Sequence, residues 1–147
     1  MKLCLCFHCL CESYQGLTGG AQELFVSLDD MRYLIEQLLS RGYKFSTMED
    51  PADKTVAISF VDGYLNNLLF NDLAQRHEIP YVVFVSSYYT MSGEGFPWLE
   101  TNGQTYEQMH RFDYYAHHRG GDGDRPVVVD TSPHRPLNFL ELSSLAA

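Results

Sequence analysis

One acidic residue, Asp62, stands at a place in the sequence where chemistry is commonly found. It follows a continuous apolar run, residues 56–60, and Gly63 comes directly after it. Sheets of parallel strands bind their ligands at the carboxyl ends of the strands, so a carboxylate here could bind a divalent metal. An acid that only hydrogen-bonds the following turn is the structural alternative. The residue type alone leaves both roles open.

The cysteines offer a second kind of chemistry near the amino terminus. All four fall within one short segment, as Cys4, Cys6, Cys9 and Cys11. Thiolates favour soft ions such as zinc or copper(I). Alternation along a strand places Cys4 and Cys6 on one face, with the later pair on the other, so four small buried residues are the alternative. Cysteines this close cannot join distant parts of a fold, which favours a reduced, cytoplasmic setting.

Alternating strands and helices are expected to position these groups. Ser27 has the character of an N-cap, with Asp30 three residues on, and apolar residues then recur at helical spacing until Arg41 and Gly42. Apolar runs predict strands, and a second helical pattern lies between two of them. The strands are expected at residues 3–10, 43–46, 56–60 and 81–85, and the second helix at 65–77. This order predicts an α/β fold with a mostly parallel sheet and outer helices.

Composition limits the classes of protein that this chain can belong to. With 147 residues and 45% hydrophobic content, it is expected to form one domain with one core. Its formal net charge of -9 argues against a nucleic-acid partner. Each apolar run is too short for a transmembrane segment, and the first one lacks a signal-peptide cleavage site, so we expect a cytoplasmic protein.

Several segments, taken in order, resemble the NodB-homology domain of polysaccharide deacetylases, carbohydrate esterase family four. They are residues 5–8, 26–27, 41–43, 56–64 and 79–85. Residues 96–100 also resemble a Trp-containing loop of one branch of that family. The resemblance implies an irregular (β/α) barrel. Because such barrels usually need about 200 residues or more, we expect a partial one over residues 2–130, with an irregular or disordered tail at 131–147.

The resemblance implies metal-dependent hydrolysis of N-acetyl or O-acetyl groups on carbohydrate. In this family a divalent metal, usually zinc, polarises the carbonyl group and activates water, and a carboxylate takes the proton of that water. The family motif Thr-Phe-Asp-Asp-Gly supplies the base first and a metal ligand second. These positions are Val61 and Asp62 here. Because valine accepts no proton, the expected activity is impaired.

The family's remaining metal ligands are a His-x-x-x-His pair, which this sequence lacks. Asp113 and His117 lie downstream of Asp62 and are separated from each other by the same four positions as that histidine pair. The resemblance therefore suggests Asp62, Asp113 and His117 as the metal-ligand set. The alternative is that residues 109–118 form a solvated amphipathic turn whose histidines bind nothing.

By the same resemblance, Tyr64, Trp98 and His8 are expected to contact substrate. His8 would lie near the mouth of the barrel, although a lone histidine there is more often structural. Tyr88 and Tyr89 could join Trp98 as aromatic platforms for a sugar. The expected partner is an N-acetylated oligosaccharide or polysaccharide.

Two other interpretations stay open from the sequence. The chain could be a catalytically inactive carbohydrate-binding module, or a gene fragment of a deacetylase whose family pattern stops near Glu100. A half-barrel would also expose open sheet edges, and such edges pair with other chains, so self-association is expected.

Overall fold

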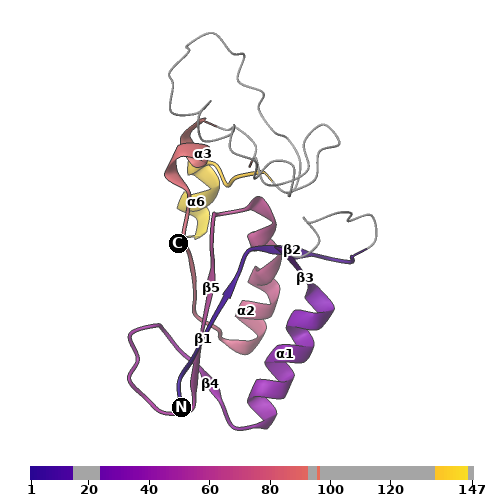
Figure 1. Ribbon diagram of the computed structural model, residues 1–147, viewed down its shortest axis with the longest axis vertical. Helices are drawn as coiled ribbons and strands as arrows, with labels where there is room; N and C mark the ends of the chain where they lie inside the picture. Colours follow the sequence, from indigo (N-terminus) through magenta and orange to yellow (C-terminus); the bar gives the residue numbers. More distant parts are fainter. Residues whose placement is uncertain (15–23, 93–95, 97–134, 146–147) are drawn as a thin grey trace, which may run out of the picture.

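The computed structural model describes residues 1–14, 24–92, 96 and 135–145 (Figure 1). The described strands are β1 (Leu3–Phe7), β2 (Cys9–Cys11), β3 (Phe25–Ser27), β4 (Lys44–Phe45), β5 (Thr55–Phe60) and β6 (Tyr81–Val83). The described helices are α1 (Leu28–Ser40), the 3₁₀ helix η2 (Leu65–Phe70), α2 (Asn71–His77), α3 (Ser87–Ser92) and α6 (Phe139–Leu145). Every described helix is too short or too polar to cross a lipid bilayer.

Strand β5 is the centre of the main sheet. It pairs in parallel with β1 on one edge, where Ile58 lies opposite Leu5, and with β4 and then β6 along the other edge. Strands β2 and β3 form a separate parallel pair. All the strand pairs named here are parallel, so the predicted α/β class with a mostly parallel sheet is confirmed. The described strands form an open sheet rather than a closed barrel.

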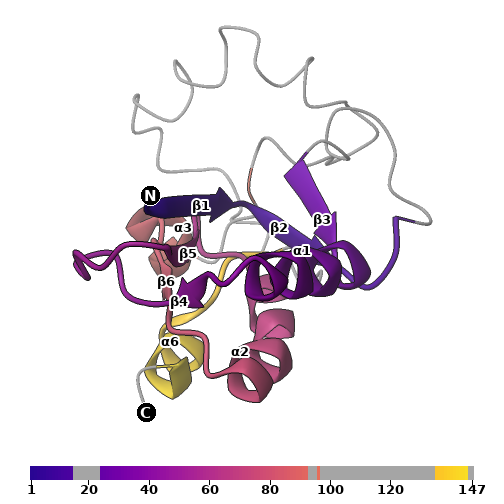
Figure 2. The ribbon, with the colours of Figure 1, turned by 90° about the horizontal axis from the view of Figure 1, so that it is seen from below.

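Helices α1 and α2 lie on one face of the main sheet in both views (Figures 1 and 2). Val56, Ile58 and Phe60 of β5 are at most 1% exposed and belong to the core cluster that these helices cover. The ring of Phe60 lies 5.2 Å from that of Phe70 and 5.8 Å from that of Tyr81. Because each of these side chains removes apolar surface from water, β5 is fixed between its neighbours and the helices.

The opposite face of the sheet carries small side chains. Cys4 lies opposite Ala57 and Cys6 opposite Ser59, and both cysteines are exposed because β1 is an edge strand. Cys9 and Cys11 are buried in β2. The expectation of four buried cysteines is therefore wrong for the first pair. Within the described residues no group of three or more His, Cys, Asp or Glu side chains could hold a metal, so the soft-metal cluster is also absent there.

Helix α1 confirms the local signals of the sequence. The Ser27 hydroxyl accepts a hydrogen bond from the Asp30 N–H at 3.1 Å and donates one to the Asp30 carboxylate at 2.9 Å. The chain leaves the helix at Gly42, whose φ of 79° suits glycine. The expected first strand differs from the observed one, since it divides at His8 into β1 and β2.

The carboxyl-terminal part of the chain also differs from expectation. Within the expected irregular tail, residues 139–145 form helix α6. The Asn138 side chain accepts from the Glu141 N–H at 3.0 Å, and the Glu141 carboxylate accepts from the Asn138 N–H at 2.8 Å, so each residue satisfies a free donor of the other. The sequence pattern would also allow a polar helix at residues 104–118 and a strand at 127–129, and both segments lie outside the described residues.

The packing around Phe60 predicts a large difference between the two faces of the sheet. Phe60→Ala is expected to lower the free energy of unfolding by about 3–5 kcal/mol, because it leaves a cavity beside the rings of Phe7, Phe70 and Tyr81. Cys6→Ser, at an exposed position of the edge strand β1, is expected to change it by about 0.5 kcal/mol or less. Urea unfolding of both variants checks this. Equal losses would contradict the assigned core.

Candidate functional site

Asp62 lies in a tight turn at the carboxyl end of β5. Its φ is 69° and that of Gly63 is 78°, so two consecutive residues have left-handed backbone. Aspartate tolerates this region better than most side chains do. The Ser86 N–H donates to the Asp62 carbonyl at 3.0 Å. A Cβ atom on residue 63 would come 2.9 Å from Val85, so both the backbone and the space require glycine.

The carboxylate of Asp62 is partly removed from water. Burial raises its pKa above the ordinary value, while the nearby His8 and a hydrogen bond from Tyr64 oppose that rise. The Tyr64 hydroxyl donates to Asp62 Oδ2 at 3.3 Å. A carboxylate with one such partner and incomplete hydration keeps lone pairs for a cation or a proton.

His8 reaches the site from the junction of β1 and β2. Its side chain is exposed, and its carbonyl accepts from the Asn67 amide at 2.8 Å. The same amide group accepts from the Tyr64 N–H at 3.1 Å, and Asn67 is only 1% exposed. Asn67 therefore ties the His8 backbone to the Asp62 turn. In the sequence Asn67 stands three positions after Tyr64, as Tyr-x-x-Asn, and this spacing alone did not predict its bridging role.

Tyr64 lies inside the fold. Its side chain is fully buried, and its ring centroid is 4.4 Å from that of Phe96. The structure thus places Tyr64 beneath Asp62 rather than on a surface open to a sugar. Tyr89 is similarly buried, at 9% exposed, whereas Tyr88 is 53% exposed. Of the two expected tyrosine platforms, only Tyr88 has the required exposure.

Val61 continues the pairing between β5 and β1, since its N–H donates to the Phe7 carbonyl at 2.9 Å. Its side chain accepts no proton. The buried thiol of Cys9 does not replace it, because burial raises the pKa of Cys9 to about 12 and keeps the sulfur protonated. The proton acceptors identified at this end of the sheet are Asp62 and His8.

The described residues provide only part of a metal site. Asp62 and His8 are of the types that zinc accepts, but zinc sites generally have three or four protein ligands. Among the described residues no set of three candidate donors is assembled. The expected ligands Asp113 and His117 lie outside the described residues, as does Trp98.

Comparison with solved structures places this fold beside a deacetylase. A de-N-acetylase from Aggregatibacter actinomycetemcomitans is similar with a TM-score of 0.55 and 15% sequence identity, over 78% of this chain. The chain spans 51% of that neighbour's length. No protein-family model and no curated protein sequence matches the chain. At this level of identity the likeness shows a deacetylase-like fold.

Removing the Asn67 bridge is expected to destabilise the chain. Asn67→Leu removes a buried hydrogen bond of the Tyr64 N–H and a partly buried one of the His8 carbonyl, at a cost of about 2–4 kcal/mol. Gln75→Leu on the exposed side of α2 is the control, expected to change stability by about 0.5 kcal/mol or less. Urea unfolding measures both. A loss for Asn67→Leu no larger than for the control would refute the bridging role.

The raised pKa of Asp62 predicts a pH dependence of stability. The folded chain binds the Asp62 proton more tightly than the unfolded chain does, so this residue lowers stability as pH rises through the interval between the two pKa values. Asp62→Asn tolerates the same backbone and removes the effect. In a chelating buffer the variant is expected to be more stable than wild type at pH 7, with the gain fading toward pH ~3. A gain of the same size at both pH values would contradict this origin.

Proposed function

We propose that this chain is a deacetylase-like protein that binds N-acetylated carbohydrate at the carboxyl edge of its sheet, with Asp62 as a metal ligand. One observation carries the proposal. In a fold similar to a de-N-acetylase, the turn after the central strand presents a half-buried carboxylate at the edge where α/β sheets bind ligands. The resemblance of residues 56–64 to the deacetylase motif also assigns the role of metal ligand to Asp62.

Zinc, when bound, would polarise the acetyl carbonyl and lower the pKa of a water molecule. Asp62 would supply one ligand, and Asp113 and His117 are the proposed others. The exposed imidazole of His8 lies close enough to Asp62 to act on the pKa of that carboxyl, and imidazole is a common proton carrier in catalysis. It would contact substrate or carry protons at the rim of the site.

The proposal includes an impaired hydrolytic step. A positioned base typically contributes about 10² to 10⁴ in rate, and Val61 cannot provide it. Substrate binding does not need that group. We therefore propose a protein that binds its carbohydrate and hydrolyses it slowly.

Restoring a carboxylate at residue 61 tests this proposal. Val61→Asp is expected to raise the rate of deacetylation of N-acetylated oligosaccharides by about 10² or more with zinc present. Val61→Asn, of similar size but without a base, is the control and is expected to give no gain. Released acetate measures the rate. No gain in a folded, zinc-loaded Val61→Asp variant would count against the enzyme proposal.

A second candidate is an inactive carbohydrate-binding protein, which the exposure of Tyr88 favours. This residue lies in α3, close in sequence to Ser86, whose N–H bonds the Asp62 carbonyl. An exposed aromatic ring beside a site is a suitable surface for stacking on a sugar. This function would require neither the metal nor the missing base.

Tyr88 gives this second candidate its own test. Tyr88→Leu is expected to weaken the binding of chito-oligosaccharides about tenfold, because it removes the stacking surface while the fold is retained. Tyr33→Leu, on the exposed side of α1, is the matched control. Calorimetric titration measures both affinities. Equal affinity in all three proteins would rule out Tyr88 as a platform.

A further inference from the structure

The turn that carries Asp62 is paired with a segment from the far end of the sequence. The Leu65 N–H donates to the Arg135 carbonyl, and the Leu137 N–H donates to the Gly63 carbonyl, each at 2.8 Å. These bonds flank an isolated antiparallel bridge between Tyr64 and Pro136. The backbone on both sides of Tyr64 is therefore fixed by residues 135–137.

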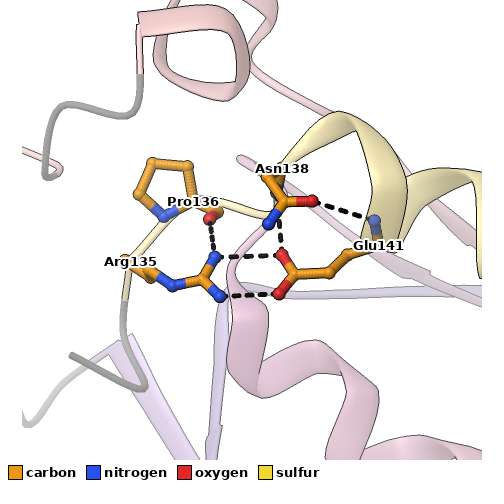
Figure 3. A network of polar contacts seen from close by, with 4 residues as sticks. All are labelled: Arg135, Pro136, Asn138 and Glu141. Carbon is orange, nitrogen blue, oxygen red and sulfur yellow. Dashed lines mark hydrogen bonds and ion pairs between the residues drawn. The ribbon is translucent and has the colours of Figure 1, made fainter. Parts of the chain in front are cut away.

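A polar network within residues 135–141 fixes the shape of this segment (Figure 3). The Arg135 guanidinium makes two parallel bonds to the Glu141 carboxylate, at 2.9 and 2.6 Å, and a third to the Pro136 carbonyl at 2.8 Å. The two side chains are only 21% and 24% exposed. A bidentate pair with this little solvent is stronger than an ordinary surface ion pair. Hydrogen bonding by Arg135 also lowers the pKa of Glu141, so the carboxylate is charged at neutral pH.

The first two residues of the helix that carries Glu141 are apolar and exposed. Phe139 and Leu140 of α6 are 76% and 81% exposed, and Leu137, just before the helix, is fully buried. This segment is attached to the Asp62 turn through the paired backbone and through the buried residues Pro136 and Leu137. The Arg135–Glu141 pair lies within the segment and fixes the shape in which residues 135–137 meet the turn.

The turn needs such support because its backbone is strained. Asp62, a residue with a side chain, is held at positive φ, which costs about 1–2 kcal/mol. Ser86 fixes the turn from the side of β6, and Leu137 fixes it from the carboxyl-terminal side. Losing the second attachment would leave Gly63 and Leu65 without these backbone partners, and the direction of the Asp62 carboxylate would be less well defined.

We propose that Arg135 and Glu141 are positioning residues that hold the Asp62 turn in its ligand-binding shape. They act through the paired backbone at Gly63 and Leu65 and do not contact the ligand. The identity of the ligand, a divalent metal, rests on the proposed function. The positioning itself does not.

Glu141→Gln is the most informative variant, because glutamine can still cap α6 but loses the charged pair with Arg135. We expect zinc affinity to fall about tenfold, as is typical when a group supporting a ligand is removed. Amide hydrogen exchange at Leu65 and Leu137 should accelerate, while Ile58 in the core keeps its protection. Arg135→Lys retains the charge without the bidentate geometry, so its zinc affinity should lie between those of wild type and Glu141→Gln. Arg32→Gln, which breaks the exposed pair with Asp29, is the control and should change neither readout.

The outcomes separate this inference from the proposed function. If wild type binds zinc and Glu141→Gln binds it equally well, the pair is merely structural and the inference is overturned, even if exchange accelerates. If wild type binds no zinc, the metal proposal fails. The positioning role is then tested by the NMR chemical shifts of the Asp62 carboxyl ¹³C and amide ¹⁵N nuclei. Shifts changed in Glu141→Gln but not in Arg32→Gln support it, and unchanged shifts refute it. Should Glu141→Gln not fold, Arg135→Lys is judged by the same criteria.

Discussion

The turn at Asp62 and Gly63 is the constraint on which the rest of this site depends. Two successive residues take left-handed backbone, and Val85 leaves no room for a side chain at residue 63. Such a conformation persists only where its surroundings fix it. Here the Asp62 carbonyl is bound by Ser86 and the Gly63 carbonyl by Leu137, so the residues after β6 and the carboxyl-terminal segment meet at one turn.

The sheet explains why this turn lies where a ligand could reach it. Strand β5 is buried along its whole length, paired on both edges, and covered by α1 and α2 on one face. Its carboxyl end therefore has a fixed position, and the carboxylate that follows is only half removed from water. The same rigidity makes the replacement at Val61 consequential, because a neighbouring strand residue cannot swing into the place of a missing base.

Local signals in the sequence predicted much of this fold. The Ser27 cap, the apolar period of α1 and the continuous run of β5 each depend on neighbouring residues, and the structure confirms them. The three residues of β3 gave no comparable signal, because so short a strand is defined by its pairing with β2. The exposure of Cys4 and Cys6 likewise follows from the edge position of β1, which no local pattern contains.

The candidate site was predictable only in part, because some of its contacts join residues that are far apart in the sequence. Asp62 was predicted from its place after an apolar strand, and the structure puts it at that strand's carboxyl end. Asn67 and Arg135 act through bonds to residues far away in the sequence, so their roles needed the assembled fold. Helix α6 depends on reciprocal bonds between Asn138 and Glu141, a capping pair that is visible in the sequence only when a helix is already suspected.

The proposed role of Asp62 as a metal ligand can be tested by metal analysis of the purified protein. The wild-type chain, dialysed against zinc and then against buffer, is compared with Asp62→Ala and with Glu49→Ala, which removes an exposed acid in the loop between β4 and β5. We expect about one zinc per chain for wild type and for Glu49→Ala, and a large loss of zinc for Asp62→Ala. Equal zinc content in all three proteins, or none in wild type, would contradict it.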